Sequence, residues 1–146
     1  MLDAVSESTA PAGSQPTRSS AQTRRVAAID IGTNSTHLLV ASVDTTLGTF
    51  SIAQAEKATT RRGERDPDSG ELTSAGMQRG YETLRRFRDL AISHDVEQIV
   101  TAATSAVREA PNGREFLQSI QDGLGMDVDL VSGPEEARLI YLGVLS

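Results

Sequence analysis

Large apolar residues are almost absent from residues 1–23 of the chain and recur at regular spacing from residue 24 to residue 146. The first segment is rich in Ser, Thr, Ala, Pro and Gln, and it buries too little apolar surface to offset the entropy of ordering it. We therefore predict a disordered tail over residues 1–23. The remaining length is sufficient for one domain with its own core.

Three apolar segments near the start of that domain have the pattern of β-strands. Residues 26–31 (VAAIDI) form a compact apolar run with one acid, closed by Gly32, and predict a buried strand. Residues 36–43 follow after a short turn, and residues 50–55 alternate apolar with polar side chains. Strands joined by such short turns predict an antiparallel meander.

A helix and a further strand follow a polar loop that spans about residues 59–71. Thr73 or Ser74 is the expected N-cap of the helix, because apolar residues then recur at helical spacing. These apolar positions are Met77, Tyr81, Leu84, Phe87 and Ala91. Residues 96–103 (VEQIVTAA) predict another buried strand.

The rest of the chain alternates in the same way. After a short turn of helix at residues 105–109, Asn112 followed by Glu115 predicts the cap of a second helix. The apolar positions of that helix are Phe116, Leu117, Ile120 and Leu124. Residues 127–131 alternate as a strand, and a last helix begins near Gly133. The order βββαβαβα predicts an α/β fold, a mixed sheet with flanking helices. This order resembles the ribonuclease-H-like lobe of the actin-like ATPase superfamily.

Composition and charge exclude several classes of function. The chain has no Cys, which excludes disulfides, thiolate metal sites and a cysteine nucleophile. The formal net charge of −6 argues against general nucleic-acid binding. No apolar run approaches the roughly 20 residues that span a bilayer. We expect a cytoplasmic protein with neither a nucleic acid nor a membrane as partner. One basic stretch, residues 57–65, is either a solvated loop or a patch for an anionic ligand.

Residues 30–35 (DIGTNS) form the first candidate site. Asp30 ends a strand predicted to be buried, where an unpaired acid is costly. Gly32 allows the backbone to approach a ligand closely. Successive N–H groups in such a turn can form an anion nest, and Thr33, Asn34 and Ser35 add side-chain donors. An ordinary hairpin turn uses the same residue types and is the alternative.

Residues 103–108 (ATSAVR) form the second candidate site. They lie where a strand enters a helix, which is where ligands bind in open α/β sheets. A helix N-terminus at Ser105 offers free N–H donors, and Arg108 can bind a phosphate through two nitrogens. The alternative is a capped helix with a surface arginine.

Residues 132–136 (SGPEE) form the third candidate site. With Ser132 as the N-cap, Glu135 falls at the N3 position and completes a capping box. Glu136 points about 100° further around the helix and remains available for other work. A carboxylate near water and a bound phosphate is a suitable general base. In the alternative, Arg138 pairs with Glu136 or a neighbouring acid as a plain surface contact.

Three segments resemble, in order, motifs of the Ppx/GppA family of exopolyphosphatases and guanosine pentaphosphatases. Residues 26–41 (VAAIDIGTNSTHLLVA) are similar to its first phosphate-binding segment, including His37. Residues 101–110 (TAATSAVREA) resemble the second, and residues 132–144 (SGPEEARLIYLGV) the catalytic-glutamate segment. The stretch Arg61-Arg62-Gly63-Glu64 resembles the family's Arg-Leu-Gly-Glu loop, although Arg62 departs from the usual Leu.

The resemblance implies a hydrolase that removes terminal phosphate from inorganic polyphosphate or guanosine pentaphosphate. Glu136 would activate the attacking water, and a Mg²⁺ ion would accompany the phosphate with Asp30 as its ligand. The implied phosphate-binding residues are Asp30, Gly32, Thr33, Asn34, Ser35, Arg61, Ser105 and Arg108. Such a division of labour suits phosphoryl transfer, in which catalysis is mostly positioning and charge neutralisation.

The family continues into a second lobe that opens with an Asp-Ile-Gly-Gly-Gly-Ser-type phosphate loop, and this chain ends before that loop. We therefore expect residues 24–146 to be the N-terminal lobe, with little turnover alone and a second lobe or a homodimer as partner. Two other functions stay open. One is a sugar-kinase or actin-like ATPase lobe, and the other is a truncated relative that binds phosphate or a protein without hydrolysis.

Overall fold

The computed structural model describes residues 23–60, 65–135 and 138. The strands and helices follow the predicted order, and the short turn of helix expected at residues 105–109 is helix α2. The elements are β1 (Thr23–Ile31), β2 (Ser35–Asp44), β3 (Thr49–Thr59), α1 (Ser74–Ser93), β4 (Gln98–Ala103), α2 (Ser105–Glu109), α3 (Gly113–Leu124) and β5 (Asp129–Leu130). Helical residues resume at Gly133.

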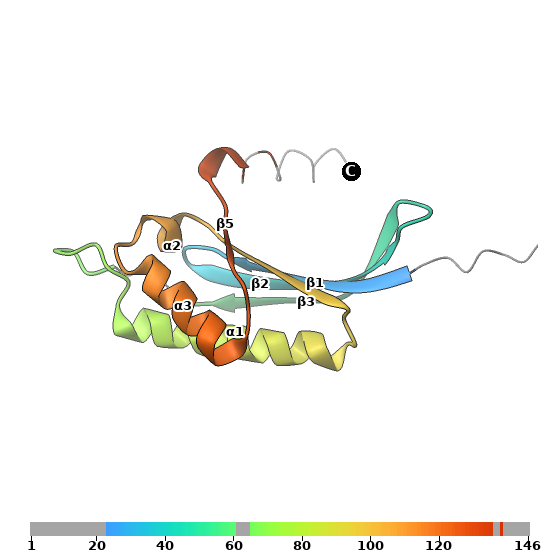
Figure 1. Ribbon diagram of the computed structural model, residues 1–146, viewed down its shortest axis with the longest axis horizontal. Helices are drawn as coiled ribbons and strands as arrows, with labels where there is room; N and C mark the ends of the chain where they lie inside the picture. The colour runs from blue at the N-terminus through green and yellow to red at the C-terminus, as the bar shows by residue number, and fades with distance from the viewer. Residues whose placement is uncertain (1–22, 61–64, 136–137, 139–146) are drawn as a thin grey trace, which may run out of the picture.

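One mixed sheet contains all of these strands in the spatial order β3-β2-β1-β4-β5 (Figure 1). The first three strands form the predicted antiparallel meander. Strand β4 then returns parallel to β1, and β5 runs parallel to β4. The parallel pairings require crossover connections, which α1 and the α2–α3 pair supply. The predicted α/β class with a mixed sheet is confirmed.

The bounds of all five strands differ from the predicted ones, and three strands show why. Strand β1 begins at Thr23, inside the segment predicted to be disordered, because Thr23 pairs with Asp44 of β2. Strand β3 extends to Thr59, since its pairing with β2 continues to Ser35. Strand β5 is only two residues long and pairs with β4 at Ala102 and Ala103 alone. In each case the length of the strand is set by its partner.

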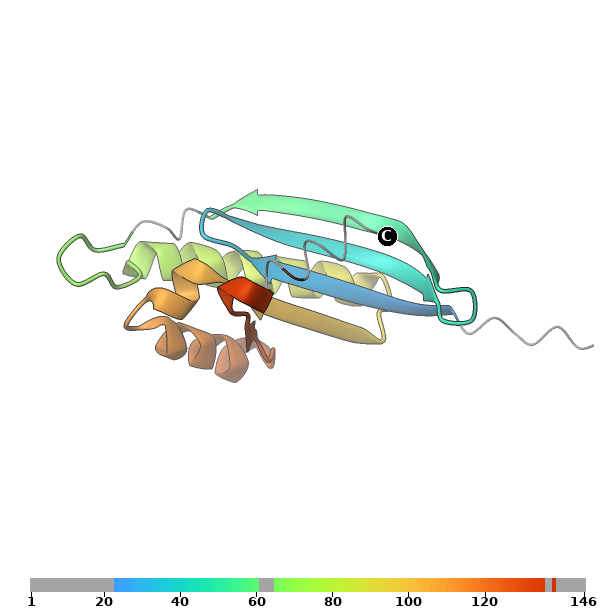
Figure 2. The same cartoon turned by 90° about the horizontal axis from the view of Figure 1, so that it is seen from above.

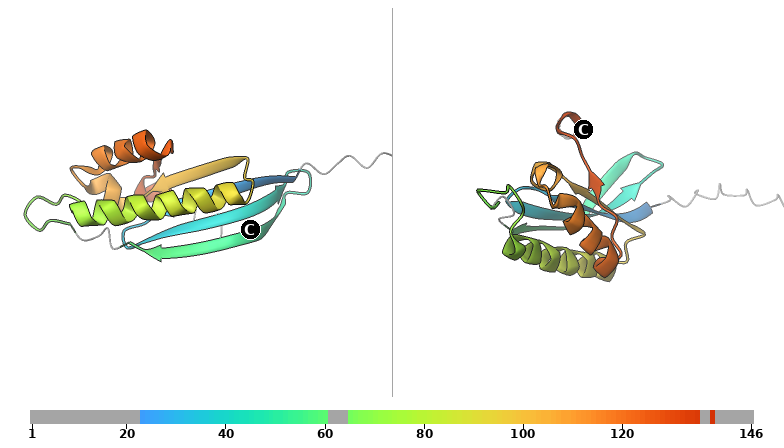
Figure 3. Two further views of the ribbon diagram at one scale, coloured as in Figure 1. Left: turned by 90° about the horizontal axis from the view of Figure 1, so that it is seen from below. Right: turned by 60° about the vertical axis from the view of Figure 1, so that its left-hand side comes forward.

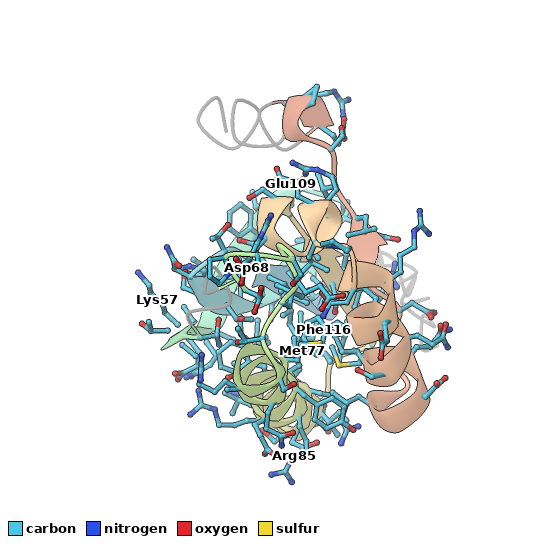
Figure 4. The ribbon with its side chains drawn as sticks, turned by 90° about the vertical axis from the view of Figure 1, so that its left-hand side faces the viewer. Lys57, Asp68, Met77, Arg85, Glu109 and Phe116 are labelled. Atoms are coloured by element: carbon cyan, nitrogen blue, oxygen red, sulfur yellow. The ribbon has the colours of Figure 1, made fainter. Side chains whose placement is uncertain are left out.

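The apolar core lies between the sheet and two helices, α1 and α3, which pack on the same face (Figure 3). Thr73 is the N-cap of α1, as predicted, and its side chain accepts a hydrogen bond from Gly76 N at 3.1 Å. Met77 and Phe116 lie between the two helices in Figure 4, and Phe116 is almost fully buried. The predicted apolar positions Leu84, Phe87, Ala91, Ile120 and Leu124 are all buried.

Neither α1 nor α3 covers the other face of the sheet (Figure 2). The prediction that residues 26–31 form a buried strand therefore holds for one face of the strand and is wrong for the other. Ile29 and Ile31 are buried in the core, whereas the alternating residues Ala28 and Asp30 are exposed. Asp30 consequently carries no burial penalty. Within the described ranges, no helix is both long and apolar enough to cross a membrane.

The joint between α2 and α3 depends on a close backbone contact at Gly113. A Cβ atom at this position would lie 1.9 Å from Val107 O, which no side chain tolerates without backbone movement. The same contact fixes the direction in which α3 leaves α2, so the joint also sets the position of α2 at the edge of the sheet.

Gly113→Ala should lower the free energy of unfolding by about 1–3 kcal/mol, the usual cost of overpacking a close contact. Gly133→Ala is the matched control, because a Cβ there meets open space. Chemical denaturation followed by circular dichroism measures both variants. Equal free energies of unfolding for the two variants would show that the backbone at the α2–α3 joint moves to accommodate a Cβ atom without loss of stability.

Candidate functional site

Two strand-end turns meet at one edge of the sheet because β1 and β4 pair in parallel. Ile31 lies opposite Ala103, and Thr104 N donates to Ile31 O at 3.2 Å. The turn after β1 and the start of α2 therefore become neighbours. The hydroxyls of Thr33 and Ser105 share a hydrogen bond at 3.1 Å, although 72 residues separate them. The first two predicted motifs thus form one site.

The turn after β1 is closed by backbone hydrogen bonds. Gly32 N donates to Ser35 O at 2.9 Å, and Thr60 N donates to Asn34 O at 2.8 Å. A Cβ atom at Gly32 would lie 3.0 Å from Ser35 O, so the closeness of the turn favours glycine. Since the N–H of Gly32 is already engaged, the ligand-binding capacity of this turn resides in its other groups, among them the Thr33 hydroxyl.

A polar row crosses the face of the sheet that α1 and α3 do not cover, beside this turn. The strand register places Asp30 directly opposite His37, and His37 directly opposite Lys57. Paired residues of neighbouring strands point to the same face, so a carboxylate, an imidazole and an ammonium group lie side by side. His37 Nε2 lies 2.9 Å from Ser35 Oγ, which holds the ring toward the turn. Lys57, predicted only as part of a basic stretch, therefore belongs to the site.

Helix α2 contributes to the site mainly through the hydroxyl of Ser105 and only weakly through its helix dipole. It has only five residues, and Thr104 makes no side-chain cap. A helix of barely more than one turn sums few peptide dipoles, so the predicted anion-binding N-terminus is weak. Arg108 of this helix donates through Nη1 to Val131 O, and its Nη2 lies 3.6 Å from Glu109 Oε1. Its predicted grip on phosphate stays a prediction.

Arg65 is a site residue that sequence reasoning missed. Its Nη2 donates to Ala106 O at 3.1 Å, to Ser105 O at 3.4 Å and to a Glu109 carboxylate oxygen at 3.3 Å. One guanidinium therefore ties the loop after β3 to the short helix that carries Ser105. The basic stretch in the sequence was the only signal, and it indicated charge without a partner.

Asn112 is the N-cap residue of α3, as predicted, but its side chain makes no cap hydrogen bond. Its side-chain amide instead accepts from Leu72 N at 2.9 Å and donates to Leu72 O at 3.0 Å. The amide thus pairs with both backbone groups of Leu72, as a neighbouring strand would, and the Leu72 side chain is buried in the core. This contact anchors the loop that also carries Arg65, and no local sequence pattern signals it.

The third motif is described only at its start. Glu135 N donates to Ser132 Oγ at 3.3 Å, which confirms Ser132 as the cap. The Glu135 carboxylate accepts a hydrogen bond from Arg138 Nη1 at 3.0 Å. Of the acids predicted as partners of Arg138, it is therefore the neighbouring Glu135 that pairs with it. Glu136 and Arg61 lie outside the described residues, as does the tail over residues 1–22.

Among residues 23–60, 65–135 and 138, no group of three or more His, Asp or Glu side chains is placed to hold a metal ion. Asp30 is a single exposed carboxylate at the site. Mg²⁺ is often bound by one or two carboxylates, with water and substrate phosphate as the remaining ligands. The described residues therefore fit a Mg²⁺ ion that arrives with a phosphate, and they do not fit a preformed protein cage.

The sheet order and the paired strand-end turns are those of the actin-like ATPase fold. The Ppx/GppA phosphatase family model matches residues 39–146. The match starts after the first turn and includes the second and third motifs. The chain belongs to the Ppx/GppA phosphatase family.

Solved structures and curated proteins agree with this assignment. The Aquifex aeolicus Ppx/GppA family member is 30% identical, with a TM-score of 0.77 over 84% of this chain and 39% of that chain. An exopolyphosphatase from Cytophaga hutchinsonii is 31% identical, with a TM-score of 0.77 over 83% and 38%. Exopolyphosphatase 1 of Mycobacterium tuberculosis is 34% identical over 121 residues, 82% of this chain and 35% of that protein. The chain thus spans about a third of the length of its curated relatives.

Arg65→Met should lower the free energy of unfolding by about 1–2 kcal/mol, because carbonyl and carboxylate oxygens of α2 lose a charged donor that is only partly exposed. Arg85→Met removes an exposed pair with Glu82 and serves as the control. Chemical denaturation gives the energies, and amide chemical shifts report whether Ser105 and Ala106 move. Unshifted Ser105 and Ala106 resonances would contradict a positioning role for Arg65.

Proposed function

We propose that this chain is the N-terminal lobe of a phosphohydrolase that releases the terminal phosphate of inorganic polyphosphate. The observation that carries the proposal is the hydrogen bond between Thr33 and Ser105. It joins two motif segments, which separately resemble ordinary turns, into one polar edge. Family membership supports the reaction class, and the exopolyphosphatase relatives support the substrate.

The hydroxyls of Thr33, Ser35 and Ser105 would donate to the phosphate oxygens, together with the Asn34 amide. Lys57 would add the positive charge that hydroxyls lack. Arg61 and Arg108 are proposed as further phosphate ligands. In phosphoryl transfer such positioning and charge neutralisation supply most of the catalysis, so an array of fixed donors is the expected design.

Asp30 would hold a Mg²⁺ ion bound to the same phosphate. The ion would neutralise charge on the phosphate oxygens when bound. Asp30 stands opposite His37 in the polar row and is exposed, so its carboxylate is accessible to a hydrated cation.

Glu136 would act as the general base toward the attacking water. Its neighbour Glu135 forms an exposed ion pair with Arg138, so the role of Glu135 is explained without catalysis. A base contributes typically about 10²–10⁴-fold to the rate of such a step. This range sets the effect expected on its removal.

The side chains of Asp30, His37 and Lys57 lie on the face of the sheet that α1 and α3 do not cover. The curated relatives are about three times as long as this chain. We propose that a second lobe, in the same polypeptide or in a partner, supplies the remaining phosphate ligands. Guanosine pentaphosphate offers the same terminal phosphoanhydride and is the alternative substrate.

Binding of tripolyphosphate in the presence of Mg²⁺ tests the cradle without requiring turnover. Ser105→Ala and Thr33→Val should each weaken binding about tenfold or more, since a hydrogen bond to a charged group contributes about 1.5–3 kcal/mol. Ser119→Ala, on the side of α3 that faces α1, is the control. Amide chemical-shift titration measures the affinity and locates the ligand. Shifts confined to other surfaces would rule out this edge.

Phosphate release from polyphosphate and guanosine pentaphosphate, with Mg²⁺ and with a second lobe added in trans, tests the reaction. Glu136→Gln should reduce kcat at least about 100-fold with KM nearly unchanged. Glu135→Gln should reduce kcat less than about twofold, because it breaks only an exposed ion pair. Similar rates in the two variants would remove Glu136 from the mechanism.

A further inference from the structure

The carboxylate of Glu109 is shared by two arginines. Its Oε2 atom lies 3.3 Å from Arg65 Nη2, and its Oε1 atom lies 3.6 Å from Arg108 Nη2. Arg65 belongs to the loop after β3, whereas Arg108 and Glu109 are the last two residues of α2. Figure 4 shows Glu109 on the outside of α2. A single acid therefore pairs with cations from two separate segments of the chain.

The two arginines lie beside the polar edge of the site. Arg65 Nη2 donates to Ser105 O at 3.4 Å. Arg108 follows Ser105 by one turn of the same short helix, and its backbone N donates to Thr104 O at 3.1 Å. The two side chains are only 28% and 29% exposed, so their charges are partly shielded from water. An anion at the Ser105 hydroxyl is thus within about one helical turn of both arginines.

Backbone oxygens hold both side chains independently of Glu109. Arg65 Nη2 donates to Ala106 O at 3.1 Å, and Arg108 Nη1 donates to Val131 O. These contacts stay when the carboxylate moves away, so both arginines remain positioned at the edge. A guanidinium group has five N–H donors, and these contacts leave other donors for a ligand.

The pairs that Glu109 makes are readily replaced. Charge-assisted hydrogen bonds between arginine and carboxylate usually measure about 2.7–2.9 Å, and both contacts here are longer. The Glu109 side chain is 55% exposed, so water competes for its oxygens. A phosphate chain carries more negative charge than one carboxylate and binds a guanidinium group through two oxygens. Such an anion outcompetes Glu109 for Arg108.

We propose that Glu109 is an internal competitor for the phosphate ligand. Its carboxylate occupies Arg108 in the free protein while Arg65 holds it in place, and a bound phosphate chain replaces it at Arg108. The inference rests on the proposed function, since it places the phosphate at the polar edge. Because the acid regains Arg108 whenever the ligand leaves, it lowers the affinity for substrate and for product phosphate alike. Glu109 thereby sets the affinity of the edge and favours product release.

Titration of the full chain with tripolyphosphate and Mg²⁺, followed by amide chemical shifts, tests the competition. Glu109→Gln keeps the size of the side chain and removes its charge. This variant should bind tripolyphosphate about twofold to fivefold more tightly, the gain expected when an exposed ion pair no longer has to be broken. Glu82→Gln is the matched control, because it removes the same charge from an exposed pair with Arg85 on α1. Its affinity should equal that of the natural sequence.

The gain should depend on Arg108. Arg108→Met alone should weaken binding, and Arg108→Met/Glu109→Gln should bind no more tightly than Arg108→Met, because the acid then has no phosphate ligand to occupy. Circular dichroism shows that each variant folds, and the titration of Glu109→Gln alone decides the proposal if Arg108→Met does not fold. A gain that persists without Arg108 would assign the effect to general charge repulsion and overturn the proposal.

The same titrations separate this inference from the proposed function. Binding at the polar edge with equal or lower affinity in Glu109→Gln would reject the competitor and leave the phosphate site standing. Chemical-shift changes that include neither Thr33 nor Ser105, in any variant, would overturn the proposed function and this inference together.

Discussion

Parallel pairing between β1 and β4 is the constraint on which the site depends. The antiparallel strands of the meander are joined by local turns, but β4 reaches β1 only after the chain has crossed under the sheet through α1. Once Ile31 lies opposite Ala103, the turn after β1 and the start of α2 are neighbours, and the Thr33 and Ser105 hydroxyls come within hydrogen-bond distance. The chemistry of the edge is a consequence of strand direction.

The short helix α2 is held in place from outside because it cannot stabilise itself. A single helical turn satisfies few of its own backbone groups and gains little from cooperativity. Arg65 supplies donors for two of its carbonyl oxygens, and the close contact at Gly113 fixes its junction with α3. The position of the Ser105 hydroxyl is therefore determined by Arg65 and by the contact at Gly113, both outside the first turn of α2.

The two faces of the sheet have different roles. The face toward α1 and α3 holds the core, with Ile29, Leu38 and Phe87 almost fully buried. The other face carries the polar row of Asp30, His37 and Lys57 next to apolar rows.

The sequence by itself determined the elements, because the spacing of apolar residues follows directly from the geometry of strands and helices. It also indicated the motif residues and the family through short local patterns such as DIGTNS. It did not reveal that Asp30 is exposed, since an apolar strand has the same composition whether one or both faces are covered. Likewise, Arg65, Lys57 and Asn112 carried no local signal for their roles. Their partners are Ser105 and Ala106 for Arg65, His37 for Lys57, and Leu72 for Asn112. Contacts between positions far apart in the chain arise only when strand pairing and helix packing bring those positions together, so only the tertiary structure decided them.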